Sequence, residues 1–383
     1  MTRRRPIAPF SGQPLVSPLQ QSVVYRSDTP DALDAMYEGD DAAFVYSREG
    51  HPNAQHVASM IDAMEGCSGG IIAPSGMAAV TLAILGSVQT GDHVLGSEQL
   101  YGRSLKLLKE ELPRLGIPTS FFDPTDIKSV EAALSPETKA ILVEVVANPS
   151  LRVADMDGLA ALTKERGIAL IVDNTFTTPL GFRPLERGAD IVLHSVTKLL
   201  SGHSDAMLGW VAAKDPEVNA RLETMAITMG MTAAPFDCWL AERGLLSFEL
   251  RHSRTQSNAA ALAQALSEMS QVRRVLYPGR PDHPDHNRAA HLLGENMGAM
   301  VSFEIEPDRA VTNAFVEALD VAFAPTLGDI TTTLSHPVSS SHRLVAAADR
   351  EAAGISEGFF RVSVGAERED QLVEAFRSAL VQL

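Results

Sequence analysis

Short apolar runs alternate with amphipathic stretches through the middle of this chain, and this alternation constrains the fold more than any other feature. Amphipathic stretches such as 105–115 and 159–166 separate the runs. Continuous apolar runs are typical of strands covered on both faces, and helices between such strands indicate βαβ units. The chain is therefore predicted to have an α/β fold with a large, doubly wound and mostly parallel sheet. The runs lie at residues 70–73, 93–96, 140–146, 168–173, 190–194 and 209–213.

The pattern changes after about residue 250, which predicts a domain boundary. Shorter apolar runs at 272–277, 300–305, 321–324 and 359–364 are separated by helical stretches, as expected of a smaller C-terminal α/β domain over 251–383. Residues 56–250 then form the large domain. The first 55 residues have no strong periodicity and hold many Pro, Ser and Asp residues. We expect 1–55 to be an extended N-terminal arm that lies on a partner subunit.

Composition narrows the classes of function. The 383 residues carry a formal net charge of −16 at pH 7, which argues against a nucleic-acid or anionic membrane surface. No uninterrupted apolar stretch reaches the length that spans a bilayer. Two cysteines are too few for a disulfide framework. We expect a cytoplasmic protein with a small-molecule substrate, no nucleic-acid or membrane partner and, because His283, His286 and His291 lack ligand spacing, no metal.

Polar residues stand at the carboxyl ends of two successive apolar runs. Asp173 ends one run, and Ser195, Thr197 and Lys198 follow the next. Ligands of open parallel sheets bind at this edge, so a carboxylate and an amine placed there can converge on one small molecule. Taken singly, each residue also suits an ordinary turn or a helix cap.

The combination matches the requirements of pyridoxal 5′-phosphate. This cofactor needs a lysine for a Schiff base and an acid against its pyridine nitrogen, which are the roles we predict for Lys198 and Asp173. A phosphate cup is also indicated. Ser75, Gly76 and Met77 precede a helical stretch, and backbone N–H groups at a helix start bind anions. The hydroxyls of Ser195 and Thr197 would complete the cup.

Several segments of the chain carry a resemblance to a known family: Tyr46-Ser47-Arg48, Ser75-Gly76-Met77-Ala78-Ala79, Tyr101-Gly102, Asn148-Pro149, Val172-Asp173-Asn174-Thr175-Phe176, His194-Ser195-Val196-Thr197-Lys198, Gly202-His203-Ser204-Asp205 and Arg361-Val362-Ser363-Val364-Gly365. They resemble the Cys/Met-metabolism family of pyridoxal-phosphate enzymes, which includes cystathionine γ-synthase, cystathionine γ- and β-lyases, methionine γ-lyase and O-acylhomoserine sulfhydrylases. The order and spacing of the segments match as well. The similarity runs from about residue 10 to the C-terminus and implies the fold-type-I transferase fold.

The resemblance implies roles for further residues. Tyr101 would stack on the cofactor ring and take part in catalysis, and Asn148 would lie near the phenolic oxygen of the cofactor and the substrate. Arg361 would grip the α-carboxylate of the substrate, which suits a planar guanidinium. Tyr46 and Arg48 would reach the phosphate of a neighbouring subunit. The resemblance thus implies shared active sites in a homotetramer that is a dimer of dimers.

Two departures from the family pattern concern the substrate. Arg103 occupies a position that is commonly small in the family, and its charge would lie beside the substrate side chain. Pro325 and Thr326 replace the glutamate and serine that cystathionine-handling members often have. Because proline cannot receive a distal amino group, we expect a smaller or anionic γ-substituted amino acid, with Thr326 among the residues that bind it.

These observations predict γ-elimination or γ-replacement on a homoserine- or homocysteine-derived amino acid in sulfur amino-acid metabolism. An alternative is β-elimination of the cystathionine β-lyase type. A catalytically silent protein that binds pyridoxal phosphate is an alternative of another class. A nicotinamide-dependent oxidoreductase would need a Gly-x-Gly-x-x-Gly turn after an early strand, and the sequence has none.

Overall fold

The computed structural model describes residues 12–38, 43–343 and 345–383. The strands of the larger sheet are β1 (Ile71–Ala73), β2 (His93–Ser97), β3 (Thr119–Phe122), β4 (Thr138–Glu144), β5 (Ala169–Asp173), β6 (Ile191–His194) and β7 (Gly209–Ala213). Those of the smaller sheet are β8 (Arg274–Leu276), β9 (Met300–Glu304), β10 (Ala322–Phe323), β11 (Thr333–Ser335) and β12 (Phe359–Ser363). The helices are α1 (Pro30–Glu38), α2 (Pro52–Glu65), α3 (Gly76–Leu85), α4 (Gly102–Lys106), η1 (Leu107–Glu111), α5 (Leu112–Arg114), α6 (Ile127–Ala133), α7 (Met156–Arg166), α8 (Thr178–Gly181), η2 (Pro184–Arg187), α9 (Pro216–Thr228), α10 (Pro235–Leu245), α11 (Phe248–Ser267), α12 (His286–Leu293), α13 (Arg309–Ala318), η3 (Pro337–Ser339), α14 (Ala347–Ala352) and α15 (Glu369–Leu380).

The larger sheet is doubly wound and mostly parallel, as predicted. Its strand order is β1-β7-β6-β5-β4-β2-β3, and β7 is antiparallel to both of its neighbours. Alternate residues of a strand face opposite sides, so Ile171 and Ile191 pack into one core while Val172 and Val192 pack into the other. Helices α3 and α9 cover the first face, and α2, α7 and α10 cover the second. Burial on both faces explains why these strands are continuously apolar.

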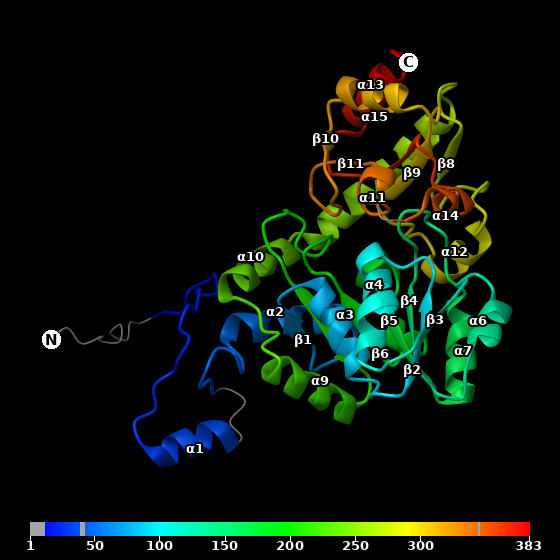
Figure 1. Ribbon diagram of the computed structural model, residues 1–383. Helices are drawn as coiled ribbons and strands as arrows, with labels where there is room; N and C mark the ends of the chain where they lie inside the picture. The colour runs from blue at the N-terminus through cyan, green and yellow to red at the C-terminus, as the bar shows by residue number, and fades with distance from the viewer. Residues whose placement is uncertain (1–11, 39–42, 344) are drawn as a thin grey trace.

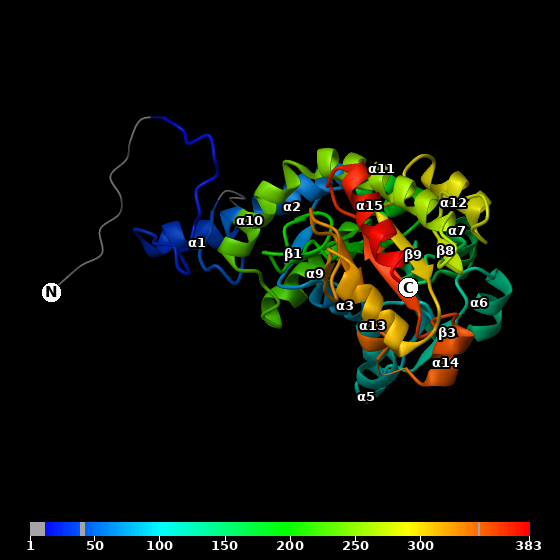
Figure 2. The ribbon, with the colours of Figure 1, turned by 90° about the horizontal axis from the view of Figure 1, so that it is seen from above.

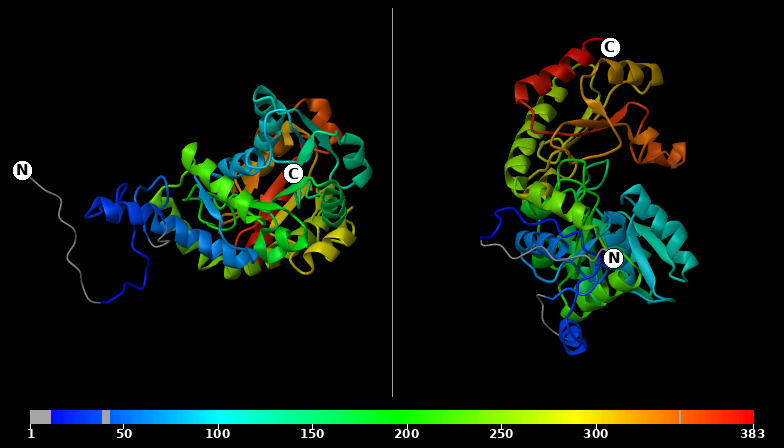
Figure 3. Two further views of the ribbon diagram at one scale, coloured as in Figure 1. Left: turned by 90° about the horizontal axis from the view of Figure 1, so that it is seen from below. Right: turned by 90° about the vertical axis from the view of Figure 1, so that its left-hand side faces the viewer.

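The smaller sheet has the order β10-β11-β12-β9-β8 and a core of its own, which includes Phe303, Phe315 and Phe376. Helix α11 joins the two units (Figure 3). Phe248 at its start belongs to the core of the larger unit, whereas Leu262 belongs to that of the smaller one. The predicted boundary at residue 250 falls in its first turn. None of the helices in the described parts of the chain is both long and apolar enough to span a bilayer.

Residues 12–38, the first described part of the chain, project from the body of the molecule (Figures 1 and 2). Helix α1 of this segment buries no residue, and the side chain of Leu15 is fully exposed. A few bonds tie the described part of the segment down: Trp239 Nε1 donates to the carbonyl of Ser17 at 3.0 Å, and Asn53 Nδ2 donates to that of Pro18 at 3.1 Å. The segment therefore has no core of its own.

Two strands lie outside the predicted apolar runs. The edge strand β3 reads Thr-Ser-Phe-Phe and is only half-buried over its first three residues. Strand β11 reads Thr-Leu-Ser. Short strands with polar positions lack the continuous apolar pattern by which the other strands were predicted.

Candidate active site

The carboxylate of Asp173 lies at the end of β5 and is held by the chain that follows it. The backbone N–H and the hydroxyl of Thr175 donate to it at 3.0 and 2.5 Å. The same hydroxyl oxygen accepts a bond from the Ser195 N–H at 2.8 Å, so Thr175 joins the chain after β5 to the chain after β6. Desolvation raises the pKa of Asp173, and the bonds from Thr175 and the charge of His194 oppose this rise. A protonated ring nitrogen placed here would stabilise the ionised carboxylate further.

Lys198 lies in the turn after β6, with its side chain half-buried. Its backbone N–H donates to the carbonyl of Ser195 at 3.0 Å, and its carbonyl accepts from Gly202 at 2.9 Å. Desolvation lowers the pKa of the Lys198 amine, and the charge of Arg361 lowers it further. A lower pKa increases the fraction of neutral amine, which is the form that attacks a carbonyl carbon.

Arg251 of α11 binds the backbone carbonyls of the residues that follow Lys198. Its guanidinium donates to the carbonyls of Leu199 and Leu200 at 2.8 Å each and to that of Gly244 at 2.9 Å. Desolvation lowers its pKa to about 10. Sequence reasoning missed this residue, because a cation inside a helical stretch gives no sign that it binds a distant turn.

Helix α3 begins against Ser195. Ser75 is its N-cap, and the Ser75 hydroxyl oxygen accepts from the N–H of Ala78 at 3.1 Å. A Cβ on Gly76 would lie 2.6 Å from the Cβ of Ser195, so only glycine allows this approach. The contact brings the N–H groups of Gly76 and Met77 to the turn that carries Lys198. The start of a helix and a hydroxyl at one place suit a phosphate group.

Ser195 and Thr197 are predicted to bind the phosphate together with the start of α3, and their hydroxyls differ in the hydrogen bonds that they make in the described chain. The hydroxyl of Thr197 donates to the carbonyl of Leu208 at 3.1 Å and accepts from its N–H at 2.9 Å. The hydroxyl of Ser195 has no hydrogen bond within the described chain. Ser195 can therefore donate to a phosphate at once, whereas Thr197 would first have to release its carbonyl acceptor.

Tyr101 is positioned by a carboxylate that sequence reasoning missed. Its backbone N–H donates to Glu144 at 2.7 Å, and its side chain is 40% exposed. Glu144 pairs in register with Asp173 on the neighbouring strand. Desolvation and the charge of Asp173 raise the pKa of Glu144 well above its usual range. The signal in the sequence was a lone carboxylate within the apolar run 140–146.

Arg361 brings the smaller unit to the site. Its Nη1 donates to Asn148 Oδ1 at 2.7 Å, and its Nη2 donates to the carbonyl of Thr326 at 2.7 Å. Its Nε is buried and has no partner in the described chain. Desolvation lowers the pKa of the guanidinium to about 10. Such an unused donor suits an anionic ligand.

The segment that contains Thr326 continues directly over the turn of Lys198. A Cβ on Gly328 would lie 2.6 Å from the carbonyl carbon of Lys198, and the φ of Gly328 is +83°. Both the close approach and the left-handed backbone require glycine here. The structure thus brings Arg361, Thr326 and Lys198 together from two units of the chain.

Three predicted residues stand apart from this group. Tyr46 and Arg48 contact each other, with the guanidinium 5.3 Å from the ring centre, and no hydrogen bond of the described chain joins them to the residues predicted to bind the phosphate. Arg103 is exposed, and its guanidinium has neither a hydrogen bond nor an ion pair among the described residues. The carboxylate of Glu110 pairs with Lys106 at 3.5 Å and not with Arg103.

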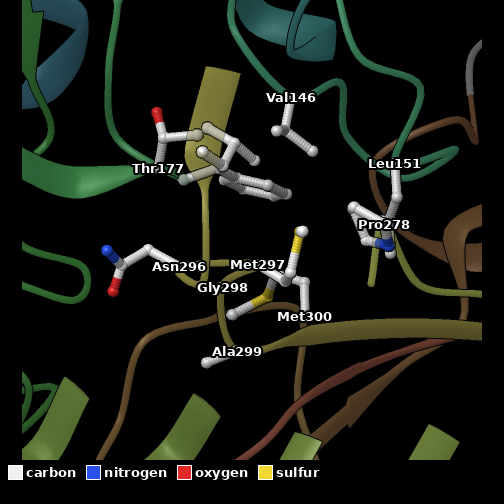
Figure 4. Close-up of a pocket in the computed structure, with 11 residues that line it drawn as sticks. Val146, Leu151, Thr177, Pro278, Asn296, Met297, Gly298, Ala299 and Met300 are labelled. Atoms are coloured by element: carbon white, nitrogen blue, oxygen red, sulfur yellow. The ribbon is translucent and has the colours of Figure 1, made fainter. Parts of the chain in front are cut away.

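A small cavity borders the chain just after Asp173. Its volume is about 10 Å³, enough for about one water molecule and too small for a cofactor. Thr177, Val146, Met297 and Met300 lie around it (Figure 4). It belongs to the packing between the two units.

A lysine, a carboxylate and a helix start at one edge of a doubly wound sheet suit an enzyme of the pyridoxal-phosphate class, and comparison with known proteins gives the family. Residues 9–381 match the family described as "Cys/Met metabolism PLP-dependent enzyme". The chain belongs to this family, and the predicted fold class, cofactor and enzyme class are confirmed.

Individual relatives have different reaction types. The chain is 39% identical to cystathionine beta-lyase of Bacillus subtilis (strain 168), over 89% of this chain and 87% of that protein. It is 36% identical to cystathionine gamma-lyase of the same organism, over 89% and 90%. A crystal structure of cystathionine gamma synthase from Xanthomonas oryzae pv. oryzae, in complex with aminoacrylate and cysteine, has a TM-score of 0.90 at 34% identity, covering 96% and 93%.

Proposed function

We propose that the protein catalyses γ-elimination or γ-replacement on a homoserine- or homocysteine-derived amino acid in sulfur amino-acid metabolism. The observation that carries the proposal is Arg361, a buried guanidinium whose Nε has no partner in the described chain. Its partner Thr326 belongs to the segment that passes directly over the turn of Lys198, and the charge of Arg361 lowers the pKa of Lys198, so both groups can act on one small molecule. An amino acid whose carboxylate binds Arg361 would have its α-carbon near the lysine.

The chain's own residues divide the chemistry between them. When bound, pyridoxal phosphate supplies a ring that accepts electrons from the carbon that loses a proton. Asp173 holds a proton on the pyridine nitrogen, and the ring of Tyr101 stacks on the cofactor. Lys198 removes protons from Cα and Cβ of the substrate, which a neutral amine can do near neutral pH. Arg361 and Asn148 orient the substrate.

The phosphate is bound by the start of α3. The N–H groups of Gly76 and Met77 and the hydroxyls of Ser75 and Ser195 are its donors in this proposal, because they lie together where α3 begins against Ser195. The Ser75 oxygen accepts from Ala78, and its own proton stays available to a phosphate. Thr197 joins them after a change of hydroxyl partner.

In this proposal, Arg103 and Pro325 determine which leaving group the site accepts. The side chain of Pro325 offers no acceptor for an ammonium group, and the carbonyl of Thr326 already accepts from Arg361. This side of the site therefore has little to bind a distal ammonium group. Arg103, which has no ion pair in the described chain, can attract an anionic γ-substituent.

β-Elimination is a second candidate, favoured by the 39% identity to a cystathionine beta-lyase. The two reactions give different products from cystathionine: 2-oxobutanoate after loss of the γ-group and pyruvate after loss of the β-group. Incubation with cystathionine, O-acetylhomoserine, O-succinylhomoserine, homocysteine and methionine, with and without a thiol, decides between them. Pyruvate as the product from cystathionine would contradict γ-chemistry, and no spectral change with any amino acid would indicate a silent binding protein.

The proposal includes a dimer of dimers in which Tyr46 and Arg48 complete the phosphate cup of a neighbouring subunit. The projecting segment that precedes them has no core of its own, which supports this role. Light scattering combined with an activity assay tests it, and a fully active monomer would contradict it. We also propose a cytoplasmic location and the three-part division 1–55, 56–250 and 251–383. Free thiols at Cys67 and Cys238, whose pKa burial raises to about 12, suit a reducing compartment.

A further inference from the structure

Glu65, the last residue of α2, is a fully buried carboxylate that binds the chain at the ends of β5 and β6. Its Oε1 lies 2.5 Å from His194 Nε2 and accepts from Asn174 Nδ2 at 2.9 Å. The exposed fraction of its side chain is 0%, and that of His194 is 1%. Neither partner is remote from the cofactor residues, since Asn174 follows Asp173 and His194 lies four positions before Lys198.

Glu65 acts from the face of the sheet opposite to Asp173. Residues two apart on a strand share a face, so Asp173 shares the α3 face with Ile171, while His194 shares the α2 face with Val192. Thr175 joins the two chain segments near Asp173, and Glu65 joins them on the opposite face of the sheet. The two strand ends are thus braced on both sides.

The partners of Glu65 are themselves fixed. The second amide hydrogen of Asn174 goes to the carbonyl of Phe182 at 2.7 Å, and its Oδ1 accepts from Thr177. The ring of His194 packs on Trp210, with centroids 5.6 Å apart. A shift of Glu65 would therefore move both strand ends and not merely two loose side chains.

The burial of the Glu65 carboxylate is unfavourable for the stability of the fold. Glu65 Oε2 is buried without a partner in the described chain. Replacing a buried polar pair by apolar groups of similar size is often neutral or stabilising, so a fold needing only cohesion would not require it. The nearby charge of His194 lowers the pKa of Asp173 against the larger rise from desolvation.

We propose that Glu65 is a positioning residue that sets the relative placement of Asp173 and Lys198 through Asn174 and His194. The proposal rests on the proposed function, because it assumes that Asp173 and Lys198 bind the cofactor. Glu65 touches neither the cofactor nor the substrate. Its loss should therefore change cofactor binding and turnover while the grip of Arg361 on the substrate stays unchanged.

The test compares Glu65→Gln with Asp62→Asn. Asp62 lies on the same helix, is also buried, and accepts two bonds, from Trp210 Nε1 at 3.0 Å and from the Gly70 N–H at 3.1 Å. It makes no hydrogen bond to Asn174 or His194 in the described chain, so it controls for the loss of a buried carboxylate in α2.

Three quantities are measured for each variant: the melting temperature of the cofactor-free protein, the Kd for added pyridoxal phosphate, and kcat with KM. For Glu65→Gln we expect a Kd at least about tenfold higher, a kcat at least about tenfold lower and a KM within about threefold of the parent, a loss of about 1.4 kcal/mol per tenfold. Asp62→Asn should lose similar thermal stability with Kd and kcat within about twofold. Equal behaviour of the two variants in Kd and kcat would overturn the proposal.

If Glu65→Gln yields no folded protein, two variants of its partner His194 test the proposal instead. His194→Gln keeps an amide that can donate to Glu65 and should retain cofactor affinity, whereas His194→Phe should lose it. Equal affinity in these two variants would overturn the positioning role. A parent protein that takes up no pyridoxal phosphate would instead contradict the proposed function, so the two failures are distinguishable.

Discussion

The two sides of the active site are built in different ways. On the cofactor side, Asp173 and Lys198 follow neighbouring strands whose register is fixed residue by residue, with Asp173 opposite Leu193. On the substrate side, Arg361 reaches from the smaller sheet to Asn148 of the larger unit. The placement of the cofactor groups therefore depends on one sheet, whereas the grip on the substrate depends on how two units meet. Variants on the first side should change cofactor chemistry, and variants on the second should change KM.

The largest effect is expected from Lys198→Ala on the cofactor side. Loss of the amine removes both the covalent attachment and the base, so kcat should fall by about 10³-fold or more. Treatment of the parent protein with borohydride, followed by mass spectrometry of peptides, should find the cofactor fixed to Lys198. The variant Lys164→Ala, at an exposed position of α7, is the control. A label on another lysine would refute the assignment.

Asp173→Asn should keep the cofactor but lower kcat by about 10²-fold or more, because a neutral amide cannot hold a proton on the pyridine nitrogen. Unchanged turnover would contradict this role. Steady-state kinetics and the visible absorbance of the purified variant measure the two properties separately.

Asp173→Asn also tests how the stability of the cofactor-free protein depends on pH. Desolvation raises the pKa of Asp173 in the folded state, so the cofactor-free fold binds this proton more tightly than the unfolded chain does. Stability from this group is present in acid and is lost as pH rises from the unfolded pKa near 4 through the raised folded value. At neutral pH Asp173→Asn should therefore raise the melting temperature of cofactor-free protein, by about 2 °C per kcal/mol in a chain of this size. A melting temperature that is lowered at pH 7 and unchanged near pH 4 would contradict a raised pKa of Asp173 in the folded state.

On the substrate side, Arg361→Lys should raise KM by about tenfold or more and leave the visible spectrum of the bound cofactor unchanged. A lysine cannot keep the bonds to Asn148 and Thr326 while it also binds a carboxylate in a planar arrangement. Arg377→Lys, on an exposed part of α15, is the control. A change in the spectrum with constant KM would mean that the two sides are not separate in the way described.

The smallest effect is expected at Arg103. If its guanidinium attracts an anionic γ-substituent, Arg103→Gly should raise KM for O-succinylhomoserine by about tenfold, or about 1.4 kcal/mol, and that for methionine by much less. Arg103→Lys keeps the charge and should retain most of the affinity. Equal changes for both substrates would show that Arg103 does not contact the γ-group.

The sequence allowed some of these features to be predicted and left others out of reach. The apolar runs that end in polar residues indicated the parallel sheet and singled out Asp173 and Lys198, because a strand's end is visible in the residues themselves. The bond between Arg361 and Asn148 joins residues 213 positions apart, and the resemblance implied roles for both without indicating that they meet. Glu65 was out of reach, since nothing local in the sequence shows that its carboxylate is buried against a distant strand.

Helix α11 has a mechanical consequence. It has 20 residues and is about 30 Å long. Near its start Arg251 binds the turn of Lys198, and at its middle Asn258 Nδ2 donates to the carbonyls of Gly365 and Glu367 at 2.9 and 2.8 Å. Gly365 lies just beyond the strand that carries Arg361. One helix therefore links the turn of Lys198 to the sheet that holds Arg361, so a displacement of that sheet would be passed on to the turn.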